Sequence, residues 1–177
     1  MPPLLKIAIV GPESTGKSSL SEALANHYKT VFVPEVAREY INQLDRPYQE
    51  KDLLQIAKSQ CEREDLLSAK GTSILICDTT LLVILIWGIV KYKRVDEWII
   101  TEEKNRLYDF YLLTDIDLPW EEDPQREHPH LRQFLFDNYK EALLKKNVAF
   151  EVVRGLGADR LTNAIACIDR MQQRSSF

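Results

Sequence analysis

Residues 4–20 read LLKIAIVGPESTGKSSL, an apolar run followed at once by a loop of glycine, hydroxyl and lysine residues. The apolar run, Leu4 to Val10, is typical of a strand that a parallel sheet buries on both faces. The loop, Gly11 to Ser18, has the spacing G-x-x-x-x-G-K-S, in which glycines let the backbone approach phosphate oxygens. An ordinary strand-to-helix turn, capped by Ser14 or Thr15, is the alternative. The complete pattern favours a phosphate-binding loop.

The predicted nucleotide site lies mostly in this loop. Lys17 is expected to reach the β- and γ-phosphates of ATP, and Ser18 to ligate Mg²⁺. The segment GLG at 155–157 follows the last predicted strand, where the backbone can pass the adenine. The residues that we expect to bind ATP are Gly11, Glu13, Ser14, Thr15, Gly16, Lys17, Ser18, Ser19 and Gly155.

The overall charge limits the kinds of partner. The chain has 177 residues, the length of one domain, with 23 Lys and Arg against 27 Asp and Glu and a net charge of −4. This balance argues against nucleic acid or an anionic membrane as a partner. It does not exclude a nucleotide, because charges more than about 8 Å apart are largely screened. We expect a small-molecule partner, and a homo-oligomer is compatible with the sequence.

Cysteine usage and hydropathy bear on the compartment. The three cysteines lie far apart in apolar or helical stretches, which indicates reduced, buried thiols and a cytoplasmic protein. The run from Ser73 to Val90 is long and apolar enough to consider as a membrane span. A span would place Asp78 in lipid at a cost of several kcal/mol. A buried strand followed by a buried helix explains the run better.

Strand and helix patterns alternate along the chain. The strands are predicted at 4–10, 31–33, 74–77, 109–113 and 148–153, and the helices at 17–28, 36–44, 52–69, 80–90, 96–107, 131–145 and 160–171. Such alternation predicts an α/β protein of the P-loop NTPase fold, with a five-stranded parallel sheet and helices on both faces. We expect residues 1–177 to form one domain, with ligands at the carboxyl ends of the strands.

One segment departs from this pattern. Residues 114–129, TDIDLPWEEDPQREHP, contain three prolines and six acidic residues with few aliphatic ones. Such a composition predicts a loop rather than a helix or strand. We interpret residues 114–131 as a lid.

Carboxylates follow several of the predicted strands, and the carboxyl ends of parallel strands meet at one edge of the sheet. Asp78 ends the run ILICD and is expected to hold Mg²⁺ opposite Ser18, with a helix cap as the alternative.

Glu35 follows the second strand, three and four residues before Arg38 and Glu39, so all three could share one helix face. A kinase needs a carboxylate to orient or deprotonate the attacking hydroxyl, and an exposed salt-bridged face is the alternative. Asp115 and Asp117 are further candidates.

The lid carries its own candidates. Arg126 and Arg132 flank it, where an arginine closing over the γ-phosphate could raise the rate about 10³-fold, although a solvated loop charge is nearly as good an interpretation. Trp120 lies on a polar, Pro-flanked loop, where it could stack on a ligand or anchor the lid on the domain. His128 and His130 lack the further ligands that a zinc site needs.

The chain resembles the ribosylnicotinamide kinase domain of NadR-type proteins. The resemblance runs over essentially the whole length and is carried by GPESTGKSSL, PEVAREYI, ICDTTLL, YDFYLLTDIDLPWEEDPQREHPHLRQ and VVRGLGADRL. It implies transfer of the ATP γ-phosphate to the 5′-hydroxyl of nicotinamide riboside, giving nicotinamide mononucleotide for NAD synthesis.

The resemblance also implies roles for particular residues. Catalysis would rest on Lys17, Glu35, Asp78 and Arg126; the riboside would be held by Glu35, Arg38, Asp78, Trp120 and Asp123; and Mg²⁺ would be held by Ser18 and Asp78. Nicotinamide riboside contains a pyridinium cation, so an indole face and nearby carboxylates are chemically suitable.

The chain also departs from the pattern of these relatives. They tend to have a second acid where Thr80 stands, and polar groups around Leu85, Gly88 and Ile89. Only ten residues precede Gly11 and there is no HxGH motif, so we expect a kinase without an adenylyltransferase domain. A deoxynucleoside or nucleoside-monophosphate kinase is the main alternative. A regulatory P-loop ATPase is a third, although the guanine-reading motif NKxD is absent.

Overall fold

The computed structural model describes residues 4–70, 72–127 and 129–175, so that Gly71 and His128 lie outside the described residues. The elements in chain order are β1 (Leu5–Val10), α1 (Lys17–His27), β2 (Phe32–Val33), α2 (Val36–Asn42), α3 (Glu50–Ser68), β3 (Ile74–Asp78), α4 (Leu81–Tyr92), α5 (Glu97–Asn105), β4 (Phe110–Thr114), the 3-10 helix η1 (Pro129–Leu131), α6 (Arg132–Lys146), β5 (Phe150–Val153) and α7 (Gly157–Ser175).

The five strands form one parallel sheet in the order β2-β3-β1-β4-β5. The first strand is therefore central, with β3 beside it on one side and β4 on the other. Ile9 is paired with Asp78 and Val10 with Leu113, so the carboxyl ends of these three strands lie level. In parallel α/β sheets, ligands bind at such a switch point. The loop after β1 opens there.

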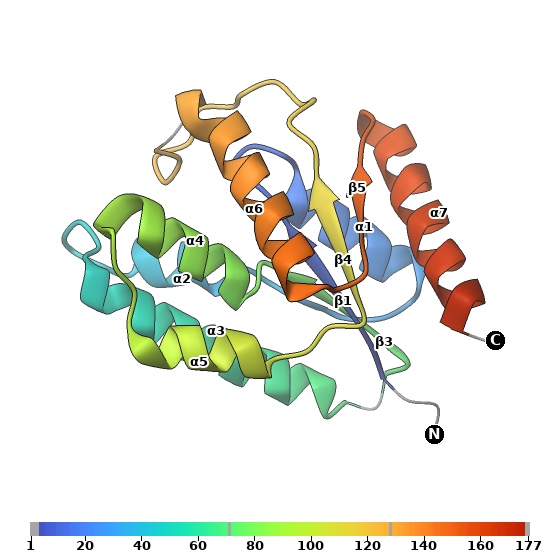
Figure 1. The fold of residues 1–177 in the computed structure, drawn as a ribbon, viewed down its shortest axis with the longest axis horizontal. Helices are drawn as coiled ribbons and strands as arrows, with labels where there is room; N and C mark the ends of the chain where they lie inside the picture. The colour runs from blue at the N-terminus through green and yellow to red at the C-terminus, as the bar shows by residue number, and fades with distance from the viewer. Residues whose placement is uncertain (1–3, 71, 128, 176–177) are drawn as a thin grey trace.

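Helices cover both faces of the sheet, as Figure 1 shows. Successive side chains of a strand point to opposite faces, and β1 illustrates this. Ile7 and Ile9 pack with α1 and α7, whereas Ala8 and Val10 pack with α4 and α6. Helix α3 covers the remaining part of the second face, next to β2 and β3. The structure confirms the predicted five-stranded parallel sheet with helices on both faces.

The apolar run at 73–90 divides into β3 and α4, both largely buried. Across the described residues, no helix is long and apolar enough to cross a membrane. Cys61, Cys77 and Cys167 are buried and are not joined in disulfides.

Two helices begin earlier than the sequence predicts. Helix α3 begins at Glu50 because Gln49 and Asp52 form a reciprocal capping box, in which the Gln49 N–H donates to Asp52 at 2.6 Å. Helix α7 begins at Gly157, three residues before its predicted start at Arg160. The segment 115–127 contains neither helix nor strand, and in Figure 1 it passes over the end of the sheet between β4 and α6. The predicted lid, 114–131, is therefore too long, because Thr114 ends β4 and Pro129–Leu131 form η1. From here on, the lid is residues 115–127.

Candidate active site

A cavity of about 470 Å³ lies at the carboxyl ends of the strands, walled by the phosphate loop, α2, α4, α6, the start of α7 and the lid. The predicted site residues that line it are Gly11, Glu13, Ser14, Thr15, Gly16, Lys17, Ser18, Ser19, Glu35, Arg38 and Arg126. Four others, Asp78, Trp120, Asp123 and Gly155, are not among the described residues of the wall. The fold therefore brings most of the predicted site to one place.

The phosphate loop is held by short contacts to itself and to the end of β4. The Thr15 hydroxyl donates to the Pro12 carbonyl at 2.7 Å and lies 2.7 Å from the Thr114 hydroxyl. Gly11 has a φ of 144°, and a Cβ there would lie 2.3 Å from Thr114 Oγ1. Only glycine fits this backbone and this distance. Thr114, the last residue of β4, thus packs against the phosphate loop at Gly11 and Thr15, and the sequence analysis did not single it out.

The Lys17 ammonium extends back over the loop and donates to the Pro12 carbonyl at 2.7 Å. Desolvation lowers the pKa of Lys17, and the carboxylates of Glu35, Asp78 and Glu13 oppose that shift. All three acids therefore lie within electrostatic range of the lysine. The lysine of the loop thus lies near acids from separate elements of the fold.

Asp78 lies directly beneath the cavity. It is completely buried, and neither oxygen of its carboxylate makes a hydrogen bond to the described residues. Burial and, after it, the charge of Glu35 raise the pKa of Asp78 to about 6, while the neighbouring Ser18 hydroxyl, Lys17 and Arg38 oppose the shift. A buried carboxylate without donors is costly unless a cation compensates it.

The turn after Asp78 has an unusual backbone. Thr79 has a φ of 67°, in the left-handed region that a β-branched residue rarely adopts. Its N–H donates to the Ile9 carbonyl at 3.2 Å, which holds the turn against β1. Thr80, rather than Asp78, occupies the N-cap position of helix α4, and it makes no side-chain capping hydrogen bond. The helix-cap alternative for Asp78 is therefore wrong, and its carboxylate is free for another role.

Glu35 and Arg38 lie at the start of α2 and both line the cavity. Glu39 does not share their face, because it pairs with Arg63 of α3 at 3.2 Å. The expectation that all three point into one cleft is therefore wrong for Glu39. A helix turns about 100° per residue, so Arg38 and Glu39 diverge.

A buried glutamine, Gln60, holds the backbone next to Glu35 and Asp78. Gln60 of α3 is 1% exposed; its side-chain oxygen accepts from the Val36 N–H at 2.9 Å. Its amide nitrogen donates to the Pro34 carbonyl at 3.2 Å and to the Thr79 carbonyl at 3.4 Å. The contacted residues are the two neighbours of Glu35 in the chain and the residue directly after Asp78. Sequence reasoning missed Gln60, since a single polar residue in a helix carries no signal of burial.

The lid is closed over the phosphate loop. The Glu121 N–H donates to the Ser14 hydroxyl at 2.9 Å, and Arg126 donates to the Glu121 carbonyl at 2.6 Å. Arg132 donates to the carbonyls of Ser14 and Leu118 at 3.1 and 2.8 Å. Ser14 therefore uses its side chain to hold the lid. Of the two arginines, Arg126 lines the cavity, and Arg132 braces the loop.

The lid is also tied to α2 and α4. Arg38 donates to Asp123 at 2.7 Å, and this contact lowers the pKa of that carboxyl. At the far end of the lid, Lys91 of α4 pairs with Glu127 at 2.7 Å. Asp123 therefore holds Arg38 in place from outside the cavity wall.

The aromatic residues of the cavity differ from the predicted one. The lid tryptophan, Trp120, donates to Glu122 at 3.1 Å and is not part of the wall. Trp87 of α4 and Tyr139 of α6 line the cavity together with apolar side chains of α2 and α4. Sequence reasoning missed both, because an aromatic residue within a helix usually belongs to the core.

A family model described as AAA domain matches residues 6–160 of the chain. No curated protein matches the chain in sequence.

Solved structures share its fold. The crystal structure of NadR protein in complex with NR gives a TM-score of 0.83 at 16% identity, over 95% of this chain and 50% of that one. A thymidylate kinase from Ehrlichia chaffeensis gives 0.64 at 14% identity, over 97% and 98% of the two chains. A deoxyadenosine kinase from M. mycoides gives 0.62 at 18% identity, over 98% and 100%.

The chain spans about half the length of the NadR proteins that it matches. At these identities the likeness concerns the fold. It confirms the predicted P-loop kinase fold and, at that level, the resemblance to NadR-type proteins.

Proposed function

The chain belongs to the AAA domain family, and within it we propose a kinase that transfers the γ-phosphate of ATP to the 5′-hydroxyl of nicotinamide riboside. The observation that carries the proposal is the shared cavity, in which Lys17 of the phosphate loop faces Glu35 and Arg38 of α2. Phosphoryl transfer needs these two halves together, a cation for the phosphates and a carboxylate for the acceptor hydroxyl.

In the proposed reaction, the oxygen of the riboside 5′-hydroxyl forms a bond to the γ-phosphorus. As it does so, the Glu35 carboxylate accepts the proton of that hydroxyl. The bond from that phosphorus to the bridging oxygen breaks, and ADP leaves with the electron pair. Lys17 and Arg126 stabilise the charge on the transferred group, and Arg38 orients the riboside. Residues aligned in this way act mainly by position and charge.

The oxygen atoms of Asp78 and Ser18 are suitable ligands for Mg²⁺. The two buried oxygens of Asp78 lack partners among the described residues, the Ser18 hydroxyl lies beside them, and Mg²⁺ prefers oxygen ligands. Ser18 and Asp78 would hold the ion, which when bound neutralises phosphate charge. Residues Gly11 to Ser19 would bind the phosphates, and Gly155 remains our prediction for the adenine.

Nicotinamide riboside as acceptor is supported by the likeness to NadR in complex with NR. The chemistry of the wall is suitable too, because Trp87 and Tyr139 offer aromatic faces and Glu121 offers a carboxylate. A pyridinium ring over an indole gains about 0.5–2 kcal/mol from cation–π attraction. Trp120 and Asp123 remain predicted substrate residues, with Asp123 acting through Arg38.

A deoxynucleoside or nucleotide kinase is the second candidate. It is favoured by the thymidylate kinase and deoxyadenosine kinase structures, which match over nearly their whole length.

A panel of acceptors distinguishes the candidates. The protein is incubated with ATP and MgCl₂ together with nicotinamide riboside, thymidine, deoxyadenosine, thymidine monophosphate or no acceptor, and ADP and the phosphorylated product are measured. We expect turnover of about 1–100 per second with nicotinamide riboside, and none in Lys17→Ala. Turnover of thymidine, deoxyadenosine or the monophosphate without turnover of the riboside would establish the second candidate. ATP hydrolysis that no acceptor changes would instead indicate a regulatory ATPase.

A further inference from the structure

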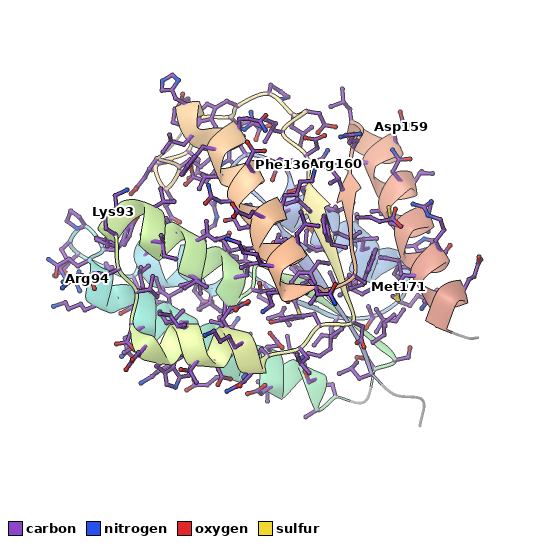
Figure 2. All side chains as sticks on the ribbon, in the orientation of Figure 1. Lys93, Arg94, Phe136, Asp159, Arg160 and Met171 are labelled. Atoms are coloured by element: carbon purple, nitrogen blue, oxygen red, sulfur yellow. The ribbon has the colours of Figure 1, made fainter. Side chains whose placement is uncertain are left out.

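One buried arginine joins three segments of the active site. Arg160 lies near the start of α7, where Figure 2 labels it, and is 4% exposed. Its Nη1 donates to Asp117 Oδ1 at 2.6 Å and to the Gly155 carbonyl at 2.9 Å. Its Nη2 donates to the Thr15 carbonyl at 2.9 Å and to the Asp115 carbonyl at 3.0 Å. The guanidinium thus contacts the phosphate loop, the root of the lid and the loop after β5.

These contacts use all the donors at the end of the side chain. A guanidinium has five N–H groups, four of them on the two terminal nitrogens. All four are taken, and the fifth, on Nε, is buried and finds no partner in the described residues. Arg160 lines the cavity but has no terminal donor left for a phosphate. Its effect on a ligand must pass through the segments that it holds.

The contact with the phosphate loop has a specific consequence. In a trans peptide the C=O and the N–H of the next residue point in opposite directions. Because the Thr15 carbonyl points at Arg160, the Gly16 N–H points away from it. Gly16 has a φ of 72° and no Cβ, and because glycine adopts many backbone conformations, the Thr15–Gly16 peptide can rotate unless a contact fixes it. Arg160 fixes the orientation of this peptide.

The same guanidinium connects that peptide to the lid root and to the loop after β5. Asp117 accepts from Arg160 through one oxygen and from the Gly155 N–H, at 2.7 Å, through the other. The pairing also explains how a buried charge is tolerated, since a carboxylate and three carbonyls surround it.

We propose that Arg160 is a positioning residue for nucleotide binding, which aims the Gly16 N–H at the bound phosphates and joins the phosphate loop to the lid root and the Gly155 loop. The inference rests on the proposed function only in that the loop binds a nucleotide. It predicts a loss of nucleotide affinity without a matching loss of acceptor affinity, which a general loss of stability would not produce.

The test compares Arg160→Met with Arg154→Met. Arg154 is an exposed neighbour that also contacts the lid root, through Asp115 at 2.6 Å, and it controls for loss of an ion pair there. Calorimetry with AMP-PNP and Mg²⁺ is run well below the melting temperature of each variant. We expect the affinity to fall at least tenfold in Arg160→Met and less than twofold in Arg154→Met. At saturating ATP, the KM for nicotinamide riboside should change less than twofold in both.

A folded Arg160→Met that binds AMP-PNP within twofold of the unaltered protein overturns the proposal. If that variant does not fold, Asp117→Asn takes its place, since it keeps the shape but removes the charge that holds Arg160. We then expect a three- to tenfold loss of AMP-PNP affinity, and unchanged affinity overturns the proposal equally. Binding is measured without acceptor, so a protein that binds AMP-PNP but phosphorylates no riboside contradicts the proposed function alone.

Discussion

The phosphate end of the cavity is one continuous loop, Gly11 to Ser18, whereas the acceptor end is assembled from α2, α4, α6 and the lid. At the phosphate end, the groups expected to bind are mostly backbone amides, and the loop holds itself through Thr15 and Pro12. At the acceptor end, Glu35 and Arg38 depend on partners in other elements.

This difference predicts which substitutions change nucleotide affinity and which change acceptor binding or the chemical step. A change in α2, α4 or α6 should disturb the acceptor or the chemical step and leave nucleotide affinity nearly intact, since the loop is held by Thr15, Thr114 and Arg160, which lie outside these helices. Each prediction below tests that separation.

Asp78 lies between the two ends, and Asp78→Asn should have the largest effect. We expect turnover to fall about 10²-fold or more, the scale of a lost electrostatic contribution. Because only the ionised carboxylate binds a cation, the affinity of the wild-type protein for Mg²⁺ should also fall as the pH drops through about 6, the pKa of this carboxyl without metal. Turnover of the variant at saturating MgCl₂ and the Mg²⁺ affinity of the wild type between pH 5 and 8 are the measurements. A variant with wild-type turnover contradicts the assignment.

The same substitution should stabilise the protein without metal. Burial raises the pKa of Asp78 from 3.8 to about 6, so the folded state binds the proton more tightly and loses stability as the pH rises through this range. A neutral amide removes this cost, so the free energy of unfolding at pH 8 in EDTA should rise by about 1–3 kcal/mol. Urea unfolding at pH 4 and pH 8 measures it. An equal change at both pH values would show that ionisation is not the cause.

The strand, loop and helix of the phosphate end were predictable because their sequence signal is local. Eight consecutive residues encode the loop, and the apolar runs before and after it encode the strand and helix. The five strands were also predictable, because buried parallel strands are continuous apolar runs. Helix α3 began two residues early because a capping box depends on the side-chain conformations of Gln49 and Asp52.

The acceptor end was only partly predictable because its contacts are distant in sequence. Gln60 contacts residues 19 to 26 positions away. The phosphate end has one such hidden contact too, because Arg160 contacts Thr15 at a separation of 145. On a helix each looks like an exposed polar residue. Strand order decides which carboxylates meet, so Glu35 and Asp78 could be proposed, but the groups that orient them could not.

Gln60→Leu tests whether the buried amide orients the acceptor end. The substitution leaves the Val36 N–H and two carbonyls without their partner, so we expect a loss of stability of about 1–3 kcal/mol. Turnover should fall about tenfold, as for a small misplacement of catalytic groups, while the KM for ATP stays within twofold. Gln55→Leu, an exposed site on the same helix, is the control. Equal changes in both variants, or a parallel rise in the KM for ATP, would remove this role.

Trp87 and Trp120 offer a matched comparison of an observed wall residue with a lid residue predicted from the sequence. If the pyridinium stacks on Trp87, Trp87→Leu should raise the KM for nicotinamide riboside about 5- to 30-fold, the equivalent of 1–2 kcal/mol. Trp120→Leu should then change it less than twofold, with the KM for ATP constant in both. The opposite order of effects would favour the residue predicted from the sequence.

Asp123→Asn should have the smallest effect. It removes the charge that pairs with Arg38, and partly exposed ion pairs contribute at most about 1 kcal/mol. We therefore expect a two- to fivefold rise in the KM for the acceptor and little change in turnover. Because the Arg38 contact lowers the pKa of Asp123, the effect should be constant from pH 5 to 8, and it should diminish in high salt as the wild-type pair is screened. Glu39→Gln removes the neighbouring pair with Arg63, which faces away from the cavity, and should change neither constant. Equal effects of the two substitutions would mean that the total negative charge near α2, rather than the contact of the lid with Arg38, controls acceptor binding.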